Sequence, residues 1–225
     1  MVSTGPPRGA VPKLARPGPL RDRVHEALLE LITTRALPPG RHLVESELAG
    51  HLGVSRQPVR EALQRLHTDG WVDLRPAQGA FVHEPTEQEA DQLLTVRTLL
   101  EAEAARLAAS HADSAGIKAL EQILAEGLDA VDAGDVDAAG VLNAQFHAKI
   151  MELAGNAVLA GLAAQVDRRV RWYRPPVAGQ RGGQSWVEHR ELVAAITARD
   201  EQLATRLMRE HTERTRRSYH AHADS

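Results

Sequence analysis

The chain has 225 residues, of which 43% are hydrophobic and only 3% aromatic, so there is room for two modest domains with cores of Leu, Ala, Val and Ile. It contains no cysteine, which excludes disulfides and thiolate metal ligands, and it has no long apolar run or signal-peptide pattern, so we expect a cytoplasmic protein without a membrane partner. The net charge of −3 is divided unevenly, because residues 1–84 carry 11 Lys and Arg against 9 Asp and Glu, whereas residues 85–225 carry 16 against 21.

The N-terminal segment shows a change from irregular to periodic sequence. Residues 1–18 are rich in Pro and Gly and lack apolar periodicity, which predicts a disordered arm. Apolar residues then recur at helical spacing from Leu20 to Arg35, and Pro38-Pro39-Gly40 ends that helix. The first domain is therefore expected to begin at residue 19.

The segment Glu45–Val82 has the order helix, glycine turn, helix and β-hairpin. A short helix over Glu45–Leu52 leads to Gly53, which suits the left-handed conformation that follows a helix. Ser55 is a good N-cap for the second helix, and two short β-runs follow that helix. This order is typical of a winged helix-turn-helix, and we predict such a domain over residues 19–84.

The second helix of this motif carries side chains that suit DNA recognition. Arg56, Gln57 and Arg60 lie near its N-terminus, on the face opposite its apolar residues. Arg and Gln make bidentate contacts with guanine and adenine edges, and Arg also neutralises phosphates. The alternative is a protein–protein module, since helix-turn-helix outlines serve that purpose too. The candidate DNA-binding residues on this helix and the hairpin are Ser55, Arg56, Gln57, Arg60, Arg75, Gln78 and Gly79.

The segment PPGRHLVESELAGHLGVSRQPVREALQRLHTDGWVDLRPAQGAFV resembles the N-terminal domain of the GntR family of bacterial transcription regulators. The resemblance covers residues 18–84, and its most specific part is the VSRQPVREAL core. It implies a role in transcription, with Gln57 standing where the family often has Thr or Ser. The positions that contact DNA in the family match Ser46, Arg56, Gln57, Arg60 and Gly79.

The character of the sequence changes at Pro85. Thr86-Glu87-Gln88-Glu89 is a capping box, and no β-pattern follows it. We predict an antiparallel all-α bundle over residues 85–220, with a flexible tail at 221–225, so the fold class is mainly α. The predicted helices are Glu87–Ser110, Ala115–Ala133, Val136–Ala154, Ala157–Arg174, Trp186–Arg199 and Glu201–Ala221, and Pro175 to Gly183 separates the fourth from the fifth.

Three histidines lie on the apolar stripes of three different predicted helices. They are His147, His189 and His211, and Asn143 precedes His147 by one helical turn. Neutral imidazoles with an oxygen donor suit zinc, nickel or another first-row divalent ion. The alternative for each histidine is a hydrogen-bonded core residue. Five further histidines fall at polar positions and are predicted to be peripheral: His25, His51, His67, His83 and His111.

The helical half resembles the FCD ligand-binding domain of the FadR subfamily, in its shorter, six-helix VanR-type branch. The segments that carry the resemblance are VRTLLEAEAARLAA, NAQFHAKIMELAGN, EHRELVAAI and LMREHTERT, within residues 87–220. In metal-binding members an acidic residue, usually Asp, occupies the place of Asn143, and histidines match His147, His189 and His211. The uncharged amide of Asn143 implies a weaker ligand at that place. A carboxylate effector or water completes the coordination in the family.

A cationic side chain beside the metal would complete the recognition of an organic acid, because the guanidinium fork fits a carboxylate. Arg97, on the first helix of the bundle, is the candidate effector-binding residue. The alternative for Arg97 is an intrahelical ion pair with Glu101, four residues later.

These features predict a transcription regulator that binds an inverted-repeat operator in double-stranded DNA as a homodimer and responds to a small organic acid. The resemblance implies that it is a repressor, since repression relieved by the effector is the commoner arrangement in the family. One alternative is a metal sensor in which the ion itself is the signal. Another is a metallohydrolase fused to a winged helix, which we disfavour because no carboxylate is well placed beside His147 as a general base. A third is a bundle without metal that only dimerises. Because we disfavour the metallohydrolase, we expect no enzymatic activity.

Overall fold

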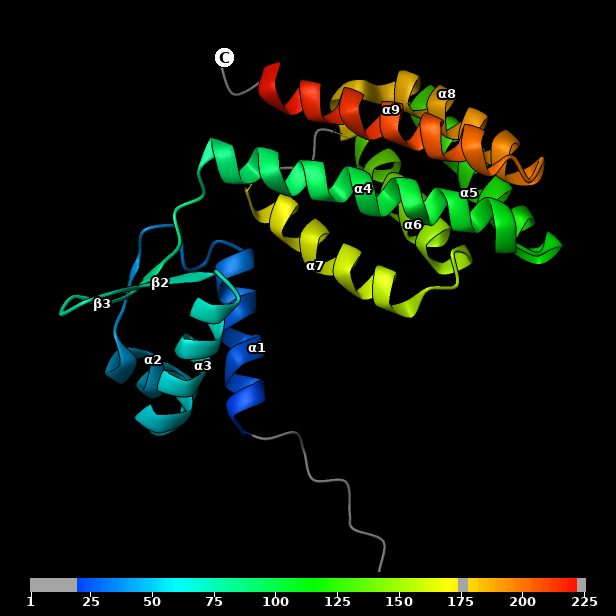
Figure 1. Ribbon diagram of the computed structural model, residues 1–225. Helices are drawn as coiled ribbons and strands as arrows, with labels where there is room; N and C mark the ends of the chain where they lie inside the picture. Colours follow the sequence, from blue (N-terminus) through cyan, green and yellow to red (C-terminus); the bar gives the residue numbers. More distant parts are fainter. Residues whose placement is uncertain (1–19, 174–177, 222–225) are drawn as a thin grey trace, which may run out of the picture. The chain divides into compact units, whose positions relative to one another are not determined.

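The computed structural model describes residues 20–173 and 178–221, and the chain divides into two compact units, Met1–Glu84 and Pro85–Ser225. Helices make up most of the described residues of both units, and a small antiparallel sheet belongs to the first (Figure 1). The predicted fold class, mainly α with an N-terminal winged helix-turn-helix, is confirmed. Within the described ranges, no helix is both long and apolar enough to cross a membrane.

The first unit has the winged helix-turn-helix order that its sequence predicts. The hairpin of the wing pairs β2 with β3, and the short strand β1 joins the other edge of β3, so the sheet order is β1-β3-β2. Strand β1 was not predicted, because two residues are too few to show an alternating pattern. The elements are α1 (Leu20–Thr33), β1 (His42–Leu43), α2 (Glu45–Leu52), α3 (Arg56–Thr68), β2 (Val72–Arg75) and β3 (Gly79–Val82).

The turn between α2 and α3 follows from its residues. Gly53 ends α2 in the left-handed conformation, with φ 65° and ψ 34°, which glycine adopts without strain. Ser55 is the N-cap of α3 as predicted, although its hydroxyl accepts no capping hydrogen bond. Val59 and Leu66 are fully buried, and α3 packs against α1. The opposite face of α3 is therefore left exposed.

The second unit is helical throughout its described part. Its first helix begins with the predicted capping box, in which Thr86 accepts from the backbone N–H of Glu89 and the Glu89 carboxylate accepts from that of Thr86. Asp113 and Asp135 cap the next two helices in the same way as N-cap acceptors. The helices are α4 (Glu87–His111), α5 (Ser114–Asp132), α6 (Val136–Leu153), α7 (Ala157–Tyr173), α8 (Ala178–Thr197) and α9 (Glu201–Ala221).

Helix α8 departs from the prediction at its N-terminus. It begins at Ala178 rather than Trp186, and it contains a non-helical residue, Gly182, with φ 40° and ψ −130°. The Gly-rich sequence before Trp186 has no apolar periodicity, so it was expected to form part of a connection. The tail was predicted at residues 221–225, but Ala221 is the last residue of helix Glu201–Ala221. The predicted arm at residues 1–18 and the rest of the tail, residues 222–225, lie outside the described residues.

The core of the second unit is built on small side chains of α4 and large ones of α6, α8 and α9. Ala104, Ala105 and Ala108 are fully buried, which lets neighbouring helices approach α4 closely. Helix α4 runs between α7 and α9 and packs against both (Figure 1). Phe146 is fully buried and stacks on His189, with 4.1 Å between ring centroids. The core therefore brings helices with inward histidines into direct contact.

Candidate functional site

The residues predicted to contact DNA lie on α2, α3 and the wing of the first unit. Arg56, Gln57 and Arg60 are exposed on the first turns of α3. The Gln57 amide donates to Glu61 Oε1 at 2.8 Å, so this side chain is held along the helix. Ser46, Ser55, Gln78 and Gly79 are also exposed.

Arg75, the basic residue of the wing, stacks on an aromatic ring. The Arg75 guanidinium carbon lies 4.3 Å from the centre of the Phe81 ring, in a cation–π contact. Gly79 has φ +101°, and a Cβ at this position would meet the ring of His42. A glycine is therefore required where the hairpin turns back beside β1.

One acidic residue also lies among these exposed side chains of α2 and α3, and it was not among the predicted site residues. Glu45, the first residue of α2, accepts hydrogen bonds from Nε and Nη2 of Arg60, both at 2.8 Å, and from Nη2 of Arg56 at 3.1 Å. The hydrogen bond from Arg60 is the main reason that the pKa of Glu45 falls to about 2. No local sequence pattern indicates this cluster, because Glu45 lies 11 residues from Arg56 and 15 from Arg60 along the chain.

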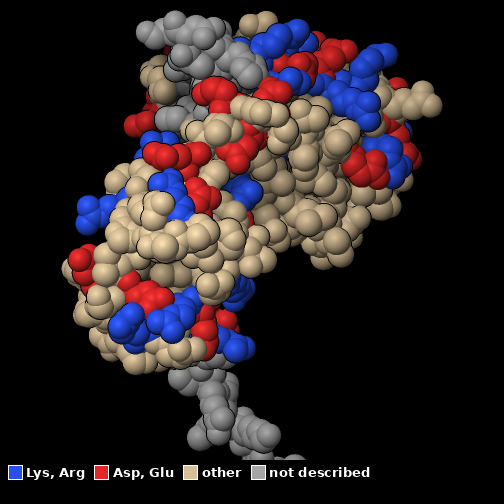
Figure 2. Space-filling model, turned by 60° about the vertical axis from the view of Figure 1, so that its left-hand side comes forward, with Lys and Arg blue, Asp and Glu red and all other residues tan. Residues whose placement is uncertain are grey.

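Basic and acidic side chains are mixed on the face of the molecule that Figure 2 shows, with Lys and Arg interspersed among Asp and Glu. In the first unit, Arg65 of α3 likewise donates to Asp22 of α1 at 3.1 Å. Recognition of DNA therefore depends on where individual arginines lie, as the small charge excess of residues 1–84 also indicates.

The three inward histidines of the second unit converge. His147 of α6, His189 of α8 and His211 of α9 are buried, and one ligand atom from each lies within 4.8 Å of the others. Their ring centroids are 4.8 to 5.3 Å apart. Asn143 is half-buried one turn before His147 on the same helix. The predicted convergence of the histidines is thus present in the structure.

Two buried carboxylates stand behind this histidine cluster. Glu101 Oε2 lies 3.1 Å from Nδ1 of His147, and Glu188 Oε2 lies 2.7 Å from Nδ1 of His211. Carboxylates in this position orient a ligating imidazole and leave its Nε2 for the metal. A carboxylate does therefore lie beside His147, but it faces the His147 ring and Arg97 and is not placed as a general base. Sequence reasoning missed Glu101 because it lies on another helix and a buried glutamate is rare.

Each of these carboxylates also forms an ion pair with an arginine. Arg97 Nε donates to Glu101 Oε1 at 2.6 Å, and Arg214 Nε lies 2.7 Å from Glu188 Oε1. Burial by itself would raise the pKa of Glu101, but the charges of Arg97 and His147 hold it well below its usual range. The Arg97–Glu101 pair, given above as an alternative for Arg97, is present, and it is partly buried, with Glu101 buried and Arg97 half-buried.

The protonation of His211 suits metal binding. Burial lowers its pKa to about 4, and this outweighs the opposing hydrogen bond with Glu188. At neutral pH the ring is therefore uncharged, which is the form that ligates metals. Three buried imidazoles, two of them backed by carboxylates, fit a first-row divalent ion such as zinc or nickel.

His25 corrects the prediction that the other histidines are peripheral. It is only 7% exposed, and its Nε2 lies 3.3 Å from Asp69 Oδ2 at the end of α3. The residue follows Val24 on the inward side of α1, so it is enclosed between the two helices. Its partner is a single carboxylate, which is typical of a core histidine.

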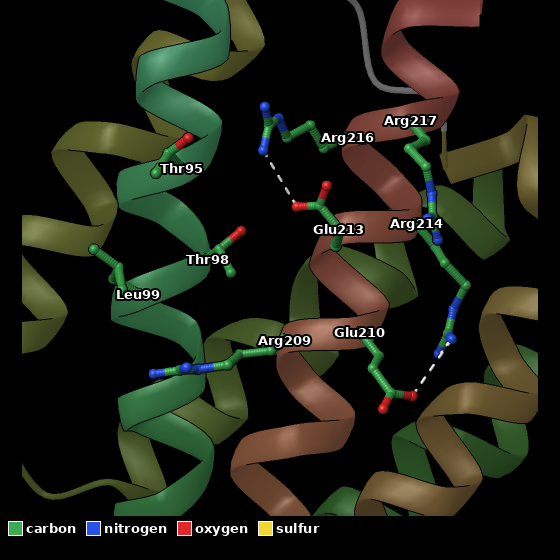
Figure 3. Close-up of a pocket in the computed structure, with 9 residues that line it drawn as sticks. All are labelled: Thr95, Thr98, Leu99, Arg209, Glu210, Glu213, Arg214, Arg216 and Arg217. Carbon is green, nitrogen blue, oxygen red and sulfur yellow. Dashed lines mark hydrogen bonds and ion pairs between the residues drawn. The ribbon is translucent and has the colours of Figure 1, made fainter.

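A hollow of about 450 Å³ lies between α4 and α9 (Figure 3). Arg97 and the histidines of the cluster are not among the residues that line it. The histidines therefore do not line this hollow, although Arg214, the partner of Glu188, does. The lining residues are Thr95, Thr98, Leu99, Arg209, Glu210, Glu213, Arg214, Arg216 and Arg217.

Comparison with protein families decides what kind of protein has this architecture. Residues 20–82 match the family described as "Bacterial regulatory proteins, gntR family", and residues 92–214 match the FCD domain. The chain belongs to the GntR family. It is a transcription regulator with an FCD domain and not an enzyme. The first match contains the exposed arginines of α3, and the second contains the histidine cluster with both of its carboxylates.

Individual relatives agree with this membership. The transcriptional repressor RspR of Escherichia coli is 28% identical over 202 residues, covering 86% of each chain. The Nta operon transcriptional regulator of Aminobacter aminovorans is 33% identical over 138 residues, 60% of this chain and 64% of that protein. Among solved structures, E. coli McbR/YncC matches with a TM-score of 0.63 and 25% identity, covering 89% of this chain and 99% of the other.

Proposed function

We propose that this GntR-family regulator is a repressor whose affinity for its operator changes when a small organic acid binds at a divalent metal ion in the FCD domain. The observation that carries the proposal is the convergence of His147, His189 and His211 within 4.8 Å, in a buried site. RspR, which is 28% identical, is named a repressor, and this supports the direction of control.

The three histidines would hold the ion, with the amide oxygen of Asn143 as a fourth ligand. Glu101 and Glu188 would orient His147 and His211 through their Nδ1 atoms. When bound, the ion supplies a Lewis-acidic position that attracts a carboxylate. The candidate effector-binding residue Arg97 would act on this position through its ion pair with Glu101.

The regulator would bind an inverted-repeat operator in double-stranded DNA as a homodimer, each subunit presenting one α3 helix. Exposed apolar side chains on the contacting helices α4 and α7 support self-association: Val96, Leu99, Val158 and Leu162 are 42 to 74% exposed. A coupling of ~1–3 kcal/mol between effector and DNA would change operator affinity about 5- to 150-fold.

The metal is tested by elemental analysis and by titration calorimetry with zinc and nickel. We expect the wild-type protein to bind one ion per chain and the double variant His147→Ala/His189→Ala to bind none. The exposed His51→Ala is the matched control and should bind like the wild type. A wild type that stays metal-free after incubation with either ion would refute the site.

Asn143 is tested by the change Asn143→Asp. A charged oxygen ligand attracts a divalent ion more strongly than an amide, so the variant should bind zinc about tenfold or more tightly. Calorimetry and competition with a chelator measure this directly. Weaker binding would show that Asn143 is not a ligand.

The buried position of the cluster favours a second candidate, a metal sensor in which the ion itself is the signal. Neither the cluster nor Arg97 lines the hollow between α4 and α9. A thermal-shift screen of organic and sugar acids, with and without zinc, separates the two candidates, since a true ligand stabilises the folded state by mass action. Stabilisation by an acid only when zinc is present supports the effector site. Operator binding that responds to zinc but to no acid supports the sensor.

A further inference from the structure

The ion-pair cluster at the start of α3 divides the two arginines of the recognition helix into different roles. Arg60 gives both Nε and Nη2, one whole edge of its guanidinium, to Glu45. Arg56 gives only Nη2, at the longer distance of 3.1 Å. Both guanidinium groups still have a pair of adjacent N–H groups, as a bidentate contact with guanine requires. Arg56 is held by one hydrogen bond rather than two and is the more exposed, so it is the freer of the two to read a base.

The same carboxylate also places a negative charge within the surface that meets DNA. The Glu45 side chain is 25% exposed, between Arg56 at 63% and Arg60 at 53%. Sequence-independent binding depends on neutralising phosphates, so a carboxylate here weakens the approach of any duplex. Base contacts must then compensate for this loss of affinity, and only DNA of the correct sequence supplies them.

We propose that Glu45 is a specificity-determining residue, which positions Arg56 and Arg60 as one unit and opposes binding to DNA of the wrong sequence. The proposal rests on the DNA-binding function of the family and not on the metal or the effector. In this proposal Arg56 contacts the edge of a base, whereas Arg60 holds Glu45 in place through its two hydrogen bonds. A pKa of about 2 keeps Glu45 ionised under all physiological conditions, so the opposition is permanent.

The experiment compares Glu45→Gln with Glu47→Gln in the full-length protein. Both changes remove one negative charge from α2, but Glu47 is exposed and its carboxylate lies outside the Arg56–Arg60 cluster. Two duplexes are used: one that the wild-type protein selects from a random-sequence pool, and one of the same composition in shuffled order. Fluorescence anisotropy gives the Kd for each at several salt concentrations, and circular dichroism checks the fold.

Glu45→Gln should bind the shuffled duplex more tightly than the wild type does, with a salt slope steeper by about one. Discrimination, the ratio of the two Kd values, should fall about fivefold or more, the lower range for one bidentate base contact. Glu47→Gln should change both Kd values by the same factor and leave discrimination intact.

Equal discrimination in Glu45→Gln and Glu47→Gln would overturn the role of Glu45, because charge alone would then explain the effect. A loss of binding to both duplexes with an intact fold would overturn it too, since Glu45 would then favour DNA binding in general. If the wild-type protein enriched no sequence from the pool, sequence reading itself would fail, and the role of Glu45 with it. These failures are distinguishable from failure of the metal site, which calorimetry measures without DNA.

Discussion

His211 shows how burial sets the chemistry of one side chain. Its folded-state pKa is lowered from 6.5 to about 4, chiefly by burial. Between these two values the unfolded chain takes up a proton at this residue and the folded chain does not. The free energy of unfolding should therefore fall as the pH drops from 6.5 towards 4, by at most ~3 kcal/mol.

This prediction is checked by thermal unfolding of chelator-treated protein between pH 7.5 and pH 4.5. The contribution of His211 is fully present above pH 6.5, so the melting temperature should be flat there and decline below it. In His211→Gln the decline should be shallower, whereas the exposed His51→Gln should follow the wild type. Identical profiles for His211→Gln and the wild type would contradict the assignment.

At the scale of elements, a single glycine fixes the contact between α5 and α8. Gly127 of α5 faces the indole of Trp186, and a Cβ at position 127 would overlap that ring. Trp186 is only 2% exposed and packs against Phe146, so it has little freedom to move. Gly127→Ala should destabilise the protein by ~1–3 kcal/mol, as overpacking does in other cores.

Gly140 of α6 provides the matched control for this change. A Cβ at that helical position meets no atom within 4 Å, so Gly140→Ala should stabilise by ~0.5–1 kcal/mol through helix propensity alone. Urea unfolding measures both variants. Equal effects at the two glycines would show that the packing of Trp186 does not depend on Gly127.

The ends of helices were predictable from the sequence where they depend on neighbouring residues. Gly53 and the Thr86–Glu89 capping box gave correct helix ends, because turns and caps depend on residues within one helical turn. The convergence of three histidines followed from the apolar stripes of their helices. By contrast, Glu101 behind His147 and Glu45 between the two arginines depend on how helices cross. No local pattern in the sequence carries that information.

At the scale of the whole molecule, the two units have separate cores and separate chemistry. The first unit exposes arginines on α3, whereas the FCD domain buries the three clustered histidines together with Glu101 and Glu188. Each family match lies within one unit, residues 20–82 in the first and 92–214 in the second. In the proposed homodimer, an effector bound in the second unit would control DNA binding by changing how the two copies of the first unit are held.

The exposed apolar residues of α7 provide a test of that dimer. Val158 and Leu162, one turn apart, are 74% and 49% exposed, which costs free energy in water unless another surface covers them. Leu162→Asp should bury a charge in the proposed interface and convert the dimer to a monomer, measured by light scattering at micromolar concentration. Its affinity for an inverted repeat should fall to about that for a single half-site, because the second contact is no longer intramolecular. Val141→Asp on α6, where the valine is 58% exposed, should remain dimeric. A dimeric Leu162→Asp with full operator affinity would place the interface elsewhere.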